Sequence, residues 1–227
     1  MTTWHASLVS HSGEILCTGA RLTRDWVVFS ATCLKRLTSS NIANHSVIIG
    51  STNDIKQTRS RRHRAVHRYI NHPEYSEPDS LHDVGLVHLA PYRGFSRLYM
   101  DDACIMPRSD LLMSIADFYK GKVTMSKIAA DNFIEVTMKN AKLKSTLCGS
   151  DKYVCSRIIN AEPEEYNLLS TPLYIRYGIG DSDWGLAGLT TNLQRTSKSG
   201  LSIIRKQLPL YAYVNWFDYI ITQYYHW

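Results

Sequence analysis

The stretch CTGARLTRDWVVFSATC, residues 17–33, belongs to two β-rich runs, 15–22 and 26–30, and it decides the expected fold. Comparable short runs recur along the 227 residues, beginning near Trp4 and continuing at 46–50, 84–89, 121–126, 133–138, 173–175 and 184–190. Turn-forming residues separate the runs, for example at 11–13 and 77–80. Regular spacing of this kind predicts an all-β barrel or sandwich, and the length suits one large β domain.

Residues 211–227 differ from the rest, because apolar side chains recur there at helical spacing. Pro209, just before this segment, is compatible with a helix start. We expect a C-terminal helix that packs one face on the body of the protein and does not insert into a membrane. The residues of that face are Val214, Phe217, Ile220, Ile221 and Tyr224.

The N-terminus and the cysteines favour a secreted or extracellular setting. No secretory signal pattern precedes the first predicted strand, so we expect a segment of a larger protein. The five cysteines are not spaced as zinc ligands, and their odd number predicts disulfides with one thiol left for a partner. Asn44-His-Ser matches the acceptor pattern for N-glycosylation, which fits the same compartment.

Three stretches resemble the trypsin family of serine proteases. Residues 17–33 resemble the family segment C-G-G-x-L-[IL]-x-x-x-W-V-L-T-A-A-H-C. HPEY at 72–75 and HDVGLVHLAP at 82–91 resemble H-P-x-Y and D-I-A-L-L-x-L-x-x-P, and LSTPL at 169–173 resembles the end of G-D-S-G-G-P-L. The resemblance implies one domain of two packed six-stranded antiparallel β-barrels and a C-terminal helix. The barrels would cover about 1–107 and 108–210, and the helix 211–227.

The same resemblance implies two disulfides, Cys17–Cys33 and Cys148–Cys155. Cys104 resembles the cysteine that links a protease domain of this family to an upstream chain. The alternative for Cys104 is a buried free thiol.

The resemblance also implies that the catalytic residues are missing. The family's chemistry needs a serine nucleophile, a histidine base and an aspartate that orients the histidine. Thr32 stands where the histidine would be, immediately before Cys33, and Leu169 stands where the serine would be. The aspartate is retained as Asp83. A threonine hydroxyl is not a base at neutral pH and leucine has no nucleophilic atom, so we expect no protease activity.

Further positions depart from the family in the second half of the chain. Asn167 replaces the oxyanion-hole glycine, Leu168 replaces the aspartate that receives the new N-terminus, and Pro163 falls at the base of the specificity pocket. Glu165 takes the place of a bracing cysteine. Ser170 and the serine of Gly180-Asp-Ser are alternative nucleophiles, but no histidine is expected to activate them, since His82 and His88 flank Asp83 on an extended segment.

A basic segment is the main candidate for binding. Six of the 26 Lys and Arg residues lie between 56 and 68, with no acidic residue among them: Lys56, Arg59, Arg61, Arg62, Arg64 and Arg68. Such a cluster attracts sulfated glycosaminoglycans or acidic proteins, and the alternative is a solvated loop. Nucleic acid is not expected, because no recognition fold accompanies the charge.

These observations together predict a non-catalytic serine protease homolog, acting as an interaction or regulatory domain within a proteolytic cascade. The partner is expected to be a protein. The alternatives are a glycosaminoglycan- or receptor-binding module and a hydrolase with a displaced catalytic set. No cofactor and no metal site are expected, because no closely spaced histidine motif such as H-E-x-x-H or H-x-H is present.

Overall fold

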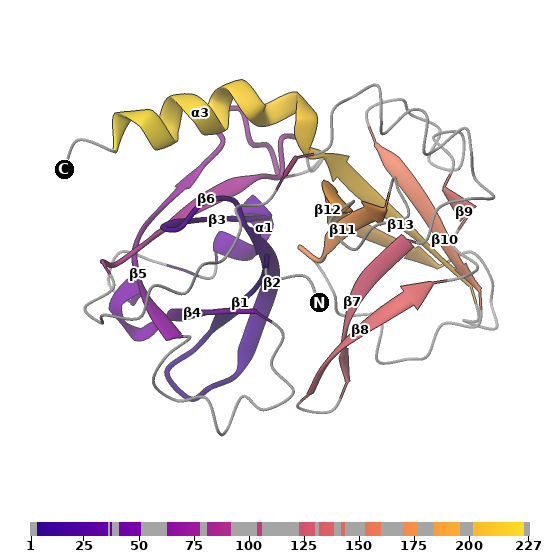
Figure 1. The fold of residues 1–227 in the computed structure, drawn as a ribbon, viewed down its shortest axis with the longest axis horizontal. Coiled ribbons are helices and arrows are strands. Elements are labelled where there is room, and N and C mark those ends of the chain that lie inside the picture. The colour runs from indigo at the N-terminus through magenta and orange to yellow at the C-terminus, as the bar shows by residue number, and fades with distance from the viewer. Residues whose placement is uncertain are drawn as a thin grey trace.

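The computed structural model describes residues 4–35, 37, 41–50, 63–77, 81–91, 104–105, 123–129, 132–138, 142–143, 153–159, 170–176, 184–195 and 202–224. Its first half is a closed antiparallel barrel in the order β1-β2-β3-β6-β5-β4 (Figure 1). The strands are β1 (His5–Val9), β2 (Ile15–Arg21), β3 (Trp26–Phe29), β4 (Ser46–Ile49), β5 (His63–Asn71) and β6 (Gly85–Leu89). The all-β prediction and the six-stranded first barrel are confirmed.

The barrel encloses an apolar cluster to which each of its strands contributes, including Leu8, Phe29 and Val87. A short helix, α1 (Ala31–Leu34), follows β3, and the hydroxyl of Ser30 caps it by accepting from the backbone N–H of Cys33 at 3.1 Å. The disulfide between Cys17 and Cys33 ties β2 to α1, as the resemblance implied. A bridge of this loop length contributes about 3 kcal/mol of stability.

The strands of the second half form one antiparallel sheet among the residues that the structure describes. They are β7 (Val123–Ala129), β8 (Asn132–Met138), β9 (Lys142–Leu143), β10 (Val154–Ile159), β11 (Pro172–Arg176), β12 (Trp184–Arg195) and β13 (Ser202–Pro209). The order across the sheet is β8-β7-β11-β12-β13-β10-β9. Closure of this sheet into a second six-stranded barrel remains a prediction.

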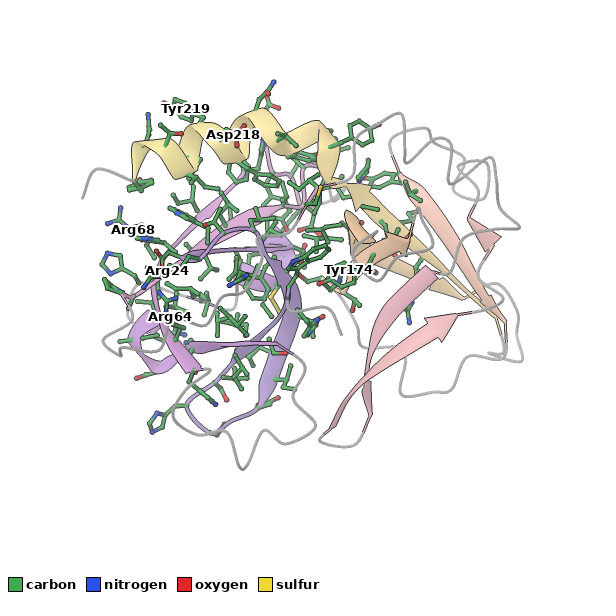
Figure 2. All side chains as sticks on the ribbon, in the orientation of Figure 1. Arg24, Arg64, Arg68, Tyr174, Asp218 and Tyr219 are labelled. Atoms are coloured by element: carbon green, nitrogen blue, oxygen red, sulfur yellow. A yellow bond between two sulfur atoms is a disulfide. The ribbon has the colours of Figure 1, made fainter. Side chains whose placement is uncertain are left out.

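The chain ends in a 3₁₀ turn, η4 (Leu210–Tyr213), and the helix α3 (Val214–Gln223). The predicted face is confirmed: Phe217, Ile220 and Ile221 are buried, whereas Asp218 and Tyr219 project outward (Figure 2). The helix leaves β13 and crosses over the first barrel (Figure 1). It therefore joins the end of the second sheet to the first barrel.

A second apolar cluster fills the junction between the two halves. It combines residues of β2, β3 and β6 with residues of β11, β12, β13 and α3. Tyr174 of β11 lies at this junction with 1% of its surface exposed, and its ring centroid is 6.0 Å from that of Trp4 (Figure 2). The shared cluster holds the first barrel against the second sheet. None of the helices in the described part of the chain is long and apolar enough to cross a bilayer.

Candidate functional site

Asp83 lies just before β6 and is completely buried. Its Oδ1 accepts the backbone N–H of Thr32, in α1, at 2.7 Å. Thr32 and Asp83 are 51 residues apart in the sequence, and the closed barrel brings them into contact. The structure thus places these two predicted site residues side by side.

The two oxygens of the Asp83 carboxylate have different surroundings. Burial raises the pKa of Asp83, while hydrogen bonds from Thr32 and Ala31 and the charge of Lys35 act in the opposite direction. Oδ2 is buried and has no hydrogen-bond partner among the described residues. In an active enzyme of the trypsin type, a histidine N–H donates to the corresponding aspartate. No imidazole of the described residues donates to Oδ2.

The hydroxyl of Thr32 is held by a tyrosine. Thr32 Oγ1 lies 2.9 Å from the phenol oxygen of Tyr75, which is half-buried beside the same turn. Burial raises the pKa of Tyr75, so the phenol is neutral at physiological pH and can donate this hydrogen bond. Sequence reasoning noted Tyr75 only as part of the H-P-x-Y match and missed its contact with Thr32.

Lys35 covers the outer side of this pair. Its ammonium nitrogen lies 5.3 Å from the centroid of the Tyr75 ring and forms an ion pair with Glu77. Thr32, Tyr75 and Lys35 are thus neighbours of Asp83 within the described part of the chain, and Lys35 is paired with Glu77. None of these three is poised as a general base at neutral pH.

Leu169 lies outside the described residues, but its neighbour Ser170 is defined. Ser170 is fully buried, and its backbone is in the left-handed region with φ at +65°. Its Oγ accepts the backbone N–H of Ser30 at 2.7 Å, and its own N–H donates to Thr190 O at 2.7 Å. Ser170 thus bridges the second sheet to the residue that caps α1. This is a structural role, and it leaves the hydroxyl without access to solvent.

Only part of the basic segment lies within the described residues. Lys56, Arg59, Arg61 and Arg62 lie outside the described residues, whereas Arg64 and Arg68 are on β5. Arg68 is half-buried, with its guanidinium carbon 4.5 Å from the centroid of the Tyr224 ring. Figure 2 shows Arg24, Arg64 and Arg68 on the same side of the first barrel.

The assignment of Arg64 to an exposed polyanion-binding surface is wrong. Only 9% of its surface is exposed, because its side chain turns in toward the neighbouring turn and the end of β6. Its Nη2 lies 2.7 Å from Asp25 Oδ1, and other guanidinium nitrogens donate to the carbonyls of Arg24 and Ala90, each at 3.1 Å. Arg64 is a structural cation with its donors already committed.

The remaining predicted sites are only partly covered by the structure. Asn44 is exposed at the end of the 3₁₀ turn η1 (Ile42–Asn44), where a glycan is sterically possible. The thiol of Cys104 is exposed, so the alternative of a buried thiol is wrong. Cys148 lies outside the described residues, and its pairing with Cys155 remains a prediction.

One group of side chains with metal-ligand spacing is present among the described residues, although none was expected from the sequence. His72, Glu74 and His82 present ligand atoms within 4.8 Å of one another. Sequence reasoning missed the group because it searched for closely spaced histidine motifs. The fold, and not local spacing, brings His82 back to His72.

The geometry of the first barrel agrees with a comparison against protein families. Residues 2–98 match the model of the trypsin family. The match spans β1 to β6 and includes both Thr32 and Asp83. Leu169 and the second sheet lie beyond the matched residues. The trypsin-like resemblance is thereby supported for the barrel that carries Thr32 and Asp83.

Proposed function

We propose that this chain is a non-catalytic serine protease homolog that acts as a protein-interaction or regulatory domain. The observation that carries the proposal is the pairing at Thr32. Its backbone N–H bonds Asp83 and its hydroxyl bonds Tyr75, at the position where a protease of this type needs an imidazole. No base of the described residues is bonded to Asp83, so in this proposal no serine is activated by the usual route.

The nearby histidine does not substitute for the missing base. His82 precedes Asp83, but its Nδ1 lies 3.1 Å from the phenol oxygen of Tyr213 and its Nε2 lies 3.5 Å from Glu74 Oε2. Both ring nitrogens are therefore directed toward partners other than Asp83. The alternative nucleophile Ser170 is buried and its Oγ accepts from Ser30, so a displaced catalytic set is not favoured.

We further propose that the domain belongs to a larger secreted or cell-surface protein of a proteolytic cascade. The disulfide Cys17–Cys33 supports an oxidising compartment. An exposed Cys104 suits a bridge to an upstream chain, and an exposed Asn44 suits glycosylation. In this proposal the second sheet is a rearranged second barrel, braced by Cys148–Cys155, and it no longer needs to build a substrate pocket.

The absence of catalysis is tested with the purified chain and a serine-directed fluorescent phosphonate. We expect no labelling above that of heat-denatured protein and no turnover of a peptide substrate library, because no base activates a serine. Trypsin at equal concentration serves as the positive control. The double variant Thr32→His and Leu169→Ser is the matched comparison, since it restores two of the residues that the chemistry needs. Labelling of the native chain that disappears in Ser170→Ala would make the pseudoprotease proposal wrong.

A second candidate function is binding of a sulfated polyanion through Lys56, Arg59, Arg61 and Arg62. The excess of positive charge in this segment favours it, and the formal net charge of the chain is +6. Replacing all four residues with alanine should lower the salt concentration at which the chain elutes from heparin. Arg64→Gln is the matched control: it should leave elution nearly unchanged, because this cation is buried and paired. Unchanged elution of the quadruple variant would contradict polyanion binding at this segment.

A further inference from the structure

Two histidines and a glutamate converge at the connection between β5 and β6. His72 directly follows β5, His82 lies three residues before β6, and Glu74 lies between them in the sequence. Their ligand atoms lie within 4.8 Å of one another. We propose that His72, Glu74 and His82 bind a zinc ion at this position.

The hydrogen bonds around the two rings direct their lone pairs toward Glu74. The backbone N–H of Glu74 donates to His72 Nδ1 at 3.2 Å, so this nitrogen carries a lone pair on the Glu74 side. His82 Nδ1 lies 3.1 Å from Tyr213 Oη. When that Nδ1 donates to the phenol oxygen, the lone pair of His82 is on Nε2, which lies 3.5 Å from Glu74 Oε2. Zinc would replace the weak backbone contact at His72 and would separate the His82 Nε2 lone pair from the Glu74 carboxylate, which it faces without a proton between them.

The rings are well packed, but one of them must rotate out of the stack for zinc to lie in the plane of both. They are stacked with centroids 4.8 Å apart and planes inclined by 11°. Tyr213 meets both rings edge-on, and Trp216 packs against His72 with centroids 4.9 Å apart. His82 also has a positive φ of 51°, an uncommon conformation that the surrounding packing maintains. The packing limits the change that zinc requires to a rotation of one side chain, since the backbone at both histidines is already in place.

The donor set selects the class of metal. Two imidazole nitrogens and one carboxylate suit Zn²⁺, whereas Ca²⁺ and Mg²⁺ prefer oxygen ligands alone. Zinc lies about 2.0–2.2 Å from such atoms, so tetrahedral ligands are about 3.3–3.5 Å apart. The separation of 3.5 Å between His82 Nε2 and Glu74 Oε2 already meets this spacing. The Glu74 side chain is 72% exposed and free to rotate toward His72, and water would complete the coordination.

A metal here would join the two ends of the β5–β6 connection. Through the contact between His82 and Tyr213, it would also stiffen the attachment of η4 and α3 to the first barrel. We therefore expect zinc to raise the Tm of the chain by about 5 °C or more at about a hundred times its dissociation constant. EDTA should reverse the shift, and Mg²⁺ should not reproduce it.

The site is tested by titrating the untagged, metal-free chain with Zn²⁺ against a chromogenic chelator. We expect one zinc per chain, and a loss of affinity of at least about tenfold in Glu74→Gln and in His82→Asn. Glu74 is exposed and asparagine tolerates positive φ, so both variants should fold. His11→Gln removes an exposed histidine elsewhere and Cys104→Ser removes the exposed thiol, and both should bind as the native chain does.

Absence of zinc binding would overturn the proposal, and so would binding that survives Glu74→Gln and His82→Asn but disappears in either control variant. Co²⁺ offers a readout that needs no variant. Its visible bands should be intense, as for four- or five-coordinate cobalt, and zinc should displace them. A weak spectrum like that of hydrated Co²⁺ would count against the site. These outcomes can be distinguished from those of the protease assay, because zinc binding is read from metal stoichiometry and cobalt spectra, whereas the protease assay reads labelling of a serine.

Discussion

Gly19→Ala is expected to destabilise the chain by about 3 kcal/mol or more, because no space exists for a methyl group at this position in β2. A Cβ on Gly19 would lie 2.3 Å from the carbonyl oxygen of Val28 and 2.6 Å from Cδ1 of Phe29. The first of these atoms is backbone in the paired strand β3, and the second belongs to a ring with no exposed surface. Relief of the clash requires β2 and β3 to separate at the closed barrel's centre.

Urea unfolding followed by tryptophan fluorescence measures this effect. Gly13→Ala is the matched control, since Gly13 has φ at +84° but nothing within 4 Å of an added Cβ. Its cost is limited to the backbone strain of about 1 kcal/mol. Unfolding of Gly19→Ala at the same urea concentration as the native chain would contradict the lack of space for a methyl group between β2 and β3.

Five of the six strands of the first barrel lie in runs that the sequence predicts, whereas β5 was missed because it overlaps the basic segment. Between Cys17 and Cys33 the sequence predicted the two strands β2 and β3 but not the short capped helix α1. The strand β13 was missed because Arg205 and Gln207 are buried within it, with 1% and 0% of their surfaces exposed. Buried polar side chains interrupt the apolar pattern from which strands are predicted. Arg64 was predicted to be exposed because a run of charged residues ordinarily faces solvent, whereas the structure buries its side chain.

Of the candidate site, the sequence predicted only contacts between residues in the stretches that resemble the trypsin family. The contact between Thr32 and Asp83 follows from the two stretches that resemble the trypsin family. The contact of Thr32 with Tyr75 joins residues 43 apart, and that of His82 with Tyr213 joins residues 131 apart. No periodicity or motif encodes such pairs, because they arise only when the barrel closes and the C-terminal turn packs on it. The cluster of His72, Glu74 and His82 escaped for this reason.

Asp83→Ala is expected to destabilise the chain by about 2 kcal/mol, whether or not the chain has any catalytic activity. The buried Oδ1 accepts the backbone N–H of Thr32. This donor belongs to the first turn of α1, the helix that carries Cys33. Removing the acceptor leaves a partly buried N–H group unsatisfied, which costs about 1–3 kcal/mol. Differential scanning calorimetry with urea titration measures the loss.

Asp83→Asn separates this structural role from a catalytic remnant. Its side-chain oxygen still accepts from Thr32, so it should retain more than half of the stability that Asp83→Ala loses. If Asp83 had no structural role, its replacement with alanine would leave the stability unchanged. Equal stability of the native chain and Asp83→Ala would therefore contradict the structural role. Because Oδ2 has no donor among the described residues, the charge of Asp83 contributes less here than it does beside an imidazole. The contact with Thr32 gives Asp83 a structural role at the first turn of α1, and this role does not depend on a catalytic base beside it.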